Sequence, residues 1–559
     1  MSLNDAQKLP VVGAMDSRLR IESKRPYVAV KGSLVNSAQQ FNATNVSNNS
    51  VQITCNPPSR GIAISRLVFK RFVYDITISG TNAGAGPLLV EGFYAPRCLP
   101  ITSTTQSEQI TINNSTITQA PISQYWGALL HYHNEFKNRF GQFSLAPSML
   151  DQSQNYEDVV NSVRNPLAPY DNNSYEQTRG GFAGLEVLSN PAGGTTATLR
   201  LTTTEPILVS PLVSGCGSNQ APAIVGVQNM SYTATLGDLS RVMSVVKDQG
   251  SGGAVDITSV AVNLASASLL FNYLTPDPLY ALPNMMETPY YSPICYPTRS
   301  SVPVPPNGSV SLTMASVQVS SIPKRIYIFA REDDSVRTAF TADSYFSLPQ
   351  TGNPLSLTWN NNQFLSQFTS QDLYNMSRKN GLGSSWSQFS KHQGSVLCLD
   401  FGIDVGLGSD QASGSLGNYQ LGITCNFVNT NPTRTITPTL YVVVISEGVF
   451  NITNGSCSQS LGVLSHADVL GARIDDDLQI EEGGDVLGGS LISGLKRAHK
   501  YLKDKKVIST GLKASSSVNP AFGVLGYGAE ALGYGMSGGA LTAKQKKSGQ
   551  KRVSLAQLA

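Results

Sequence analysis

Apolar and polar residues alternate along several stretches of this chain, and this period of two constrains the fold more than any other feature. In 397–405 and 419–427 every second residue is apolar, and shorter runs of the same kind surround Leu199 and Leu312. Successive side chains of a strand point to opposite faces, so these runs predict strands with one buried face. The runs 326–330 and 440–446 are continuously apolar, which predicts strands buried on both faces.

Stretches rich in Gly, Asn, Ser and Pro separate these runs, a pattern typical of β-sandwiches with long loops. Charged residues make up only 14% of the 559 residues, which suits strands, turns and surfaces that meet other proteins. Helical patterns are confined to 123–138, 151–163 and 371–378. The expected fold class is therefore all-β, with two tandem sandwiches and a few inserted helices.

The domain division follows from a proline-rich passage at 276–306. Proline cannot donate a hydrogen bond to a strand ladder, so we expect this passage to be a linker along the surface. The expected parts are an N-terminal arm (1–24), a first sandwich (25–275), the linker (276–306), a second sandwich (307–465) and a C-terminal tail (466–559).

The tail differs from the rest of the chain in charge. After an acidic run at 475–485, residues 490–559 contain twelve Lys or Arg against two acidic residues, a net charge of +10. Since the whole chain carries a formal charge of +3, the remainder sums to −7. A split of this kind marks a separate module. Within it, a basic helix would have one apolar face formed by Leu491, Leu495, Ala498 and Leu502.

Several classes of site are not predicted. No run of about 18 apolar residues suggests a membrane span, and the first residues lack the pattern of a secretory signal. Seven cysteines without a C-x-x-C motif predict free thiols in a reducing compartment rather than disulfides. His131 and His133 lie close together, but no other ligand type accompanies them, so we expect no metal and no cofactor.

No catalytic constellation is predicted either. The segment 535–539 matches G-x-S-x-G, but no Asp, Glu or His follows it, and the overlapping G-x-G-x-x-G lacks a preceding strand. Asp400 and Asp404 could suggest acid–base work, but their place opposite the apolar side of a strand favours surface or interface carboxylates. Core or interface anchors are the expected roles of Trp126, Trp359 and Trp386.

Five segments of strand and turn carry a resemblance. They are VQITCNPPSRGIAISRLVF (51–69), LLFNYLTPDP (269–278), SSIPKRIYIFARE (320–332), QDLYNMSRKNGLGSSWSQFS (371–390) and TPTLYVVVISEGVFNI (437–452). These segments resemble the double jelly-roll major capsid proteins of polinton-like viruses and virophages, within the adenovirus-type lineage of icosahedral DNA viruses. The likeness extends from about residue 25 to 460.

The resemblance implies a structural protein of the virion, made in the host cell and not an enzyme. Each sandwich would be a jelly roll, and three copies would form a homotrimer, a pseudo-hexagonal capsomer of a shell around double-stranded DNA. Implied partners are other copies of the chain, penton proteins and minor capsid proteins. A flank with few charges suits such contacts because its desolvation costs less than that of a lysine-rich surface.

The tail also contains candidate processing sites. The segment 536–540, MSGGA, resembles the substrates of adenovirus-type maturation proteases, which would cut between Gly539 and Ala540. A weaker match places a cut between Gly489 and Ser490. Two glycines let an extended chain enter a narrow cleft, although they also fit a flexible linker.

The basic residues of the tail have three interpretations. They could form a solvated charged face, contact packaged DNA through its phosphates, or bind an internal membrane or a minor capsid protein through the amphipathic helix. The candidate contact residues are Lys496, Arg497, Lys500, Lys503, Lys505, Lys506, Lys546, Lys547, Lys551 and Arg552.

Two other functions stay open on the sequence alone. One is a virion spike or receptor-binding protein, although the chain shows no internal repeat. The other is a carbohydrate-active enzyme on a jelly-roll scaffold, which would need two carboxylates facing each other in a groove.

Overall fold

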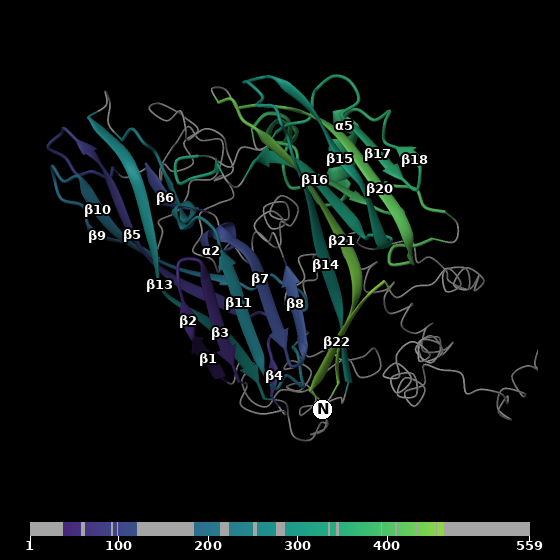
Figure 1. Cartoon of the computed structure of the whole chain (residues 1–559), viewed down its shortest axis with the longest axis horizontal. Coiled ribbons are helices and arrows are strands. Elements are labelled where there is room, and N and C mark those ends of the chain that lie inside the picture. Colours follow the sequence, from purple (N-terminus) through teal and green to yellow (C-terminus); the bar gives the residue numbers. More distant parts are fainter. Residues whose placement is uncertain are drawn as a thin grey trace, which may run out of the picture. The chain divides into compact units, whose positions relative to one another are not determined.

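The computed structural model describes residues 37–56, 62–90, 93–97, 99–119, 184–212, 223–249, 254–275, 285–333, 336–341, 346–392, 394–408, 411–431, 434–453 and 455–462. All of these residues belong to one compact unit that spans 1–470. The described part is mostly β, and its strands form two groups (Figure 1). Strands β1 to β13 pair only with one another, and so do strands β14 to β22.

The first sandwich has a larger sheet in the order β1-β13-β5-β10-β9, with β4 beside β13. Its pairs are antiparallel, and β5 and β10 stay in register over eleven residue pairs, from Phe69 with Pro206 to Ser79 with Thr196. The strands of this sheet are β1 (Ser37–Asn42), β4 (Ala63–Ile64), β5 (Phe69–Asn82), β9 (Leu185–Ser189), β10 (Thr196–Pro206) and β13 (Val255–Leu274).

The second sheet of this sandwich has the order β2-β3-β11-β7-β8. A two-stranded sheet, β12-β6, and two short helical segments, α2 (Pro100–Thr104) and a 3-10 turn at Leu239–Val242, accompany it. The strands are β2 (Asn45–Val46), β3 (Ser50–Cys55), β6 (Tyr94–Pro96), β7 (Thr105–Ile112), β8 (Ser115–Gln119), β11 (Met230–Leu236) and β12 (Met243–Val245).

The second sandwich, coloured from teal to yellow-green in Figure 1, pairs the sheet β14-β21-β16-β19, with β22 beside β21, and the sheet β15-β20-β17-β18. Its strands are β14 (Met285–Arg299), β15 (Ser309–Ser321), β16 (Arg325–Glu332), β17 (Leu355–Trp359), β18 (Asn362–Phe364), β19 (Leu397–Asp400), β20 (Leu416–Val428), β21 (Pro438–Thr453) and β22 (Ser456–Leu461).

The period-two prediction is confirmed in β20, where all five apolar residues of 419–427 are buried and the residues between them are more exposed. The continuously apolar runs also behave as predicted. Residues 326–330 in β16 and 440–446 in β21 are buried at every position. Strands covered on both faces need apolar side chains at every position, whereas strands with one open face need them only at every second position.

The proline-rich linker is the part of the domain division that needs correction. Residues Met285–Arg299 form strand β14, which pairs with β21 along its whole length. Pro289, Pro293 and Pro297 are four residues apart, so their missing N–H groups all lie on the same side of the strand. Because β14 is an edge strand, that side can face away from β21, and no ladder hydrogen bond is lost.

The helical prediction at 371–378 is confirmed by α5 (Ser370–Lys379). Thr369 and Asp372 form a reciprocal capping box, in which the Thr369 hydroxyl accepts from the Asp372 N–H and the Asp372 carboxylate accepts from the Thr369 N–H. A π-helical turn follows at Gln388–His392. The helices expected at 123–138 and 151–163 lie outside the described residues.

Candidate functional site

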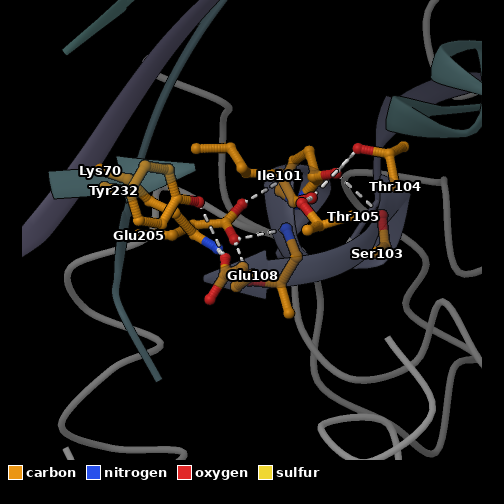
Figure 2. A network of polar contacts seen from close by, with 10 residues as sticks. Lys70, Ile101, Ser103, Thr104, Thr105, Glu108, Glu205 and Tyr232 are labelled. Carbon is orange, nitrogen blue, oxygen red and sulfur yellow. Dashed lines mark hydrogen bonds and ion pairs between the residues drawn. The ribbon is translucent and has the colours of Figure 1, made fainter. Parts of the chain in front are cut away.

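A cluster of charged side chains lies inside the first sandwich, between its two sheets (Figure 2). The Lys70 ammonium, on β5 of one sheet, forms an ion pair with the Glu108 carboxylate, on β7 of the other. Both residues are fully buried. The Tyr232 hydroxyl, on β11, donates to the same Glu108 oxygen at 3.0 Å. This buried polar link joins the sheets where apolar contacts would otherwise hold them together.

Glu205, on β10, extends this arrangement to helix α2. Its carboxylate accepts from the N–H groups of Ile101 at 2.7 Å and Thr102 at 2.9 Å, and from the Thr102 hydroxyl at 2.7 Å. These N–H groups lie at the start of a helix and lack partners within it, so the carboxylate satisfies them. Burial raises the pKa of Glu205, while the Lys70 charge and the bonds from α2 oppose that change.

The chemistry of this cluster is structural. Two carboxylates, a lysine and a tyrosine could serve as acids and bases, but Lys70, Glu108, Glu205 and Tyr232 each have no exposed surface. A substrate cannot approach side chains that solvent does not reach. Burial and the Glu108 carboxylate raise the pKa of Tyr232 well above its usual value, so the phenol stays protonated as a donor.

The second sandwich contains at least three ion pairs among its described residues, and one bidentate arginine pair is placed differently. The Arg325 guanidinium, on β16, donates to both carboxylate oxygens of Asp400, on the adjacent strand β19, at 2.9 Å each. The pair therefore lies within one sheet, and its side chains keep 14% and 10% of their exposure. Such bidentate geometry is the strongest form of the arginine–carboxylate contact.

The prediction that Asp400 and Asp404 are surface or interface carboxylates is wrong for Asp400, which is buried against Arg325. The strand also ends at Asp400 instead of continuing to Val405. Asp404 closes the turn that follows, because its carboxylate accepts from the Asp400 N–H at 2.9 Å and the Asn380 side-chain amide at 2.6 Å. Ile403, at the tip of this turn, is 64% exposed.

Hydrogen bonds join the two sandwiches at several places. The Tyr291 N–H of β14 donates to the Ser210 hydroxyl at 3.1 Å, and two further places involve Arg97 and Cys457. At one, the Arg97 guanidinium donates to the carbonyls of Thr338 and Thr341 at 2.9 and 2.6 Å, and the Val245 N–H donates to Ala339 at 2.9 Å. At the other, the Cys457 N–H donates to the Asn114 side chain at 2.6 Å. Arg97 is buried, so its bonds to the other sandwich are shielded from water.

The cysteines of the described part and Trp359 agree with their predicted roles, whereas the role of Trp386, half-buried beside Tyr374, stays a prediction. Five cysteines are free thiols, and four of these are buried. Burial raises the pKa of Cys55 and of Cys398 to about 12, which makes both unreactive. Trp359 is a core residue, stacked on Tyr419 at 5.2 Å between ring centroids. The other free thiols belong to Cys295, Cys425 and Cys457.

Other predicted site residues lie outside the described residues. They comprise the candidate cleavage positions Gly489, Ser490, Gly539 and Ala540, the basic residues of the tail, and also His131, His133 and Trp126. Within the described ranges, no group of three potential ligands could hold a metal ion. Among the same residues, no helix has the length and apolar character that a membrane crossing requires.

Sequence reasoning missed the buried polar link, although a signal for it exists. Lys70 is in phase with the inward residues Phe72 and Tyr74 of β5, and Glu108 is in phase with Ile110 and Ile112 of β7. A charge in the apolar phase of an alternating strand must be paired or hydrogen-bonded inside the fold. The positions of Lys70 and Glu108 in the alternating pattern could therefore have shown that both residues are buried, but not that they contact each other.

Comparison with known proteins places both sandwiches in one lineage. A family described as the Sputnik virophage major capsid protein first domain matches residues 5–274, and the major capsid protein V20 C-terminal domain matches 295–393 and 390–448. The putative capsid protein V20 of Sputnik virophage is 31% identical over 579 residues, covering 96% of this chain and 95% of that protein.

Solved structures agree with this. A chain of the Sputnik virophage cryo-EM structure is 29% identical and has a TM-score of 0.72, covering 86% of this chain and 96% of that one. The mavirus major capsid protein shares the fold at 14% identity, with a TM-score of 0.62 and coverage of 80% and 95%. The two sandwiches therefore match the double jelly-roll fold.

Proposed function

Because this chain belongs to the family of virophage major capsid proteins, we propose that three copies close into a pseudo-hexagonal capsomer of the virion shell. Membership in this family makes the chain a structural protein of the virion capsid and removes the spike and the carbohydrate-active enzyme as alternatives. The observation that carries the proposal is the match over almost the whole chain, which includes both sandwiches.

The proposed trimer has a geometric basis. Each chain contributes two sandwiches that close their sheets separately, so three chains contribute six similar units around one axis. Heterologous contacts around a threefold axis close into a ring and leave no unsatisfied copy of the interface. Such capsomers would tile a shell around double-stranded DNA, together with penton and minor capsid proteins.

The experiment is to purify the full chain, measure its mass in solution by light scattering, and image it by negative-stain electron microscopy. We expect particles of three times 59.6 kDa with a squat, six-lobed outline. A chain that stays monomeric at high concentration would contradict the proposal.

We also propose that the tail, 466–559, is a separate module on the inner side of the shell. Within it, residues 490–559 carry a net charge of +10, which supports contact with DNA phosphates or with an anionic membrane, and its Gly-Gly sequences support maturation by a viral protease. Cleavage after Gly539 would remove the last 20 residues, and cleavage after Gly489 would remove 70. The intact mass of the protein from purified virions distinguishes these forms from the uncut chain.

A further inference from the structure

Two sheets of the described fold, one in each sandwich, have outer faces without charge. Strands β2, β3, β11, β7 and β8 contain a single charged residue, Glu108, and it points inward. Strands β15, β20, β17 and β18 contain none at all. In a chain with 14% charged residues, two open sheet faces of this kind require an explanation.

The first hydroxyl face is the outer side of β3, β11, β7 and β8. Register places Thr54, Ser231, Thr111 and Thr116 in one row across these strands, and the hydroxyls of Thr111 and Thr116 lie 3.0 Å apart. A second row runs parallel to the first and consists of Gln52, Thr233, Gln109 and Thr118. These eight side chains are exposed or half-buried.

The second hydroxyl face is the outer side of β15, β20, β17 and β18. Thr313 and Thr424 are directly paired, with their hydroxyls 3.1 Å apart, and Thr424 is paired with Ser356 on its other side. The Gln363 amide donates to the Ser356 hydroxyl at 2.8 Å, which carries the row to β18. Around this row lie Ser309, Ser311, Gln318, Ser320, Thr358, Gln420 and Asn426, all exposed or half-buried.

The other two sheets have different outer faces. On the sheet β1-β13-β5-β10-β9, Arg200 and Asp75 form an exposed ion pair at 2.8 Å, and Arg71, Glu186 and Asp256 also lie outside the core. On the sheet β14-β21-β16-β19, the central strands are buried on both faces. Each sandwich thus has one hydroxyl face and one sheet that is either charged or covered.

We propose that the two hydroxyl faces are contact surfaces between copies of this chain in the capsomer. The inference rests on the proposed trimer and names the surfaces that hold it together. A neighbouring copy is the occupant that fits, because uncharged faces of identical chains bring no like charges together and leave no buried ion without a partner.

The construction of the faces supports close packing. Threonine is restricted in rotamer by its branched Cβ, and hydroxyls already bonded along a row lose little freedom when a partner covers them. Strand spacing gives each face a flat area of about 400 Å². In a ring of heterologous contacts, each interface joins one face of one chain to one face of the next, so the strands alone supply about 400 Å² of the ~800 Å² per partner that stable interfaces bury.

The test introduces lysines that the isolated chain tolerates. Gln52→Lys with Gln109→Lys changes the first face, and Thr313→Lys with Gln420→Lys changes the second, since all four side chains are exposed. The matched control is Thr77→Lys with Gln40→Lys, two exposed positions on the outer side of the charged sheet that are separated by strand β13. Thermal unfolding checks that each variant is folded, and sedimentation velocity measures its oligomeric state.

We expect both face variants to stay folded while the dissociation constant of the oligomer rises by at least about 100-fold, with the control unchanged. Face variants that assemble like the wild type would overturn the inference and leave the proposed trimer standing. A wild-type chain that is monomeric would instead contradict the proposed function. A face variant that does not fold is replaced by Gln109→Lys or Gln420→Lys alone, to which the same two outcomes apply.

Discussion

The two sandwiches differ in how they use a buried ion pair. In the first, Lys70 and Glu108 connect opposite sheets and neither has any exposed surface. In the second, Arg325 and Asp400 connect neighbouring strands of one sheet and retain some contact with solvent. A pair that crosses the core cannot be rehydrated when one partner is lost, whereas a pair near the surface can. Two sandwiches of similar fold can thus differ greatly in how much of their stability depends on one ion pair.

The largest effect is expected from Lys70→Met. It leaves the Glu108 carboxylate buried without its counter-ion, which costs about 3–5 kcal/mol of unfolding free energy. Urea unfolding of the purified chain measures this loss. The double variant Lys70→Met with Glu108→Leu should recover most of the stability, because it removes both charges. Equal losses in the single and double variants would mean that packing, and not charge, explains the effect.

Substitutions in the apolar interior of the second sandwich should change the free energy of unfolding through packing alone. Ile326→Ala, in a strand buried on both faces, leaves a cavity and is expected to cost about 2–4 kcal/mol. Ser311→Ala, on the exposed side of β15, is the matched control and should change stability by less than about 0.5 kcal/mol. The same urea series measures both, and a loss in the control as large as that of Ile326→Ala would contradict the burial pattern.

Arg325→Met tests the other half of the comparison. It removes two charge-assisted hydrogen bonds, but Asp400 can gain water, so the expected loss is about 1.5–3 kcal/mol and smaller than for Lys70→Met. Arg325→Lys should retain the charge and lose the bidentate geometry, which gives an intermediate value. If Arg325→Met were the more damaging of the two methionine variants, the contrast between the sandwiches would be wrong.

The smallest effect is a pH dependence at Glu205. Burial raises the pKa of this carboxyl in the folded state, so its contribution to stability is complete below the unfolded pKa and decreases as pH rises through the folded pKa. The glutamine in Glu205→Gln cannot ionise, so the stability of this variant does not decrease as pH rises through that pKa. Relative to the wild type, the variant should therefore gain stability between pH 4 and pH 8. Unfolding midpoints at both pH values measure the difference, and a relative loss would contradict the sign.

The sequence by itself determined several of the strands and which of their faces are buried. The alternation in 419–427 and the continuous apolar runs of β16 and β21 suffice for that, because side-chain direction in a strand depends only on position along it. The capping box at Thr369 likewise contains its own signal within four residues.

Only the tertiary structure decided which strands are neighbours. The three prolines of β14 favour a linker until the strand is known to lie at a sheet edge, where their missing N–H groups cost nothing. Asp400 likewise reads as a surface carboxylate until Arg325 is known to lie beside it. The partner of Lys70 is 38 residues away, and the hydroxyl rows join residues from four strands. Such pairings depend on contacts between distant parts of the chain, which local periodicity does not encode.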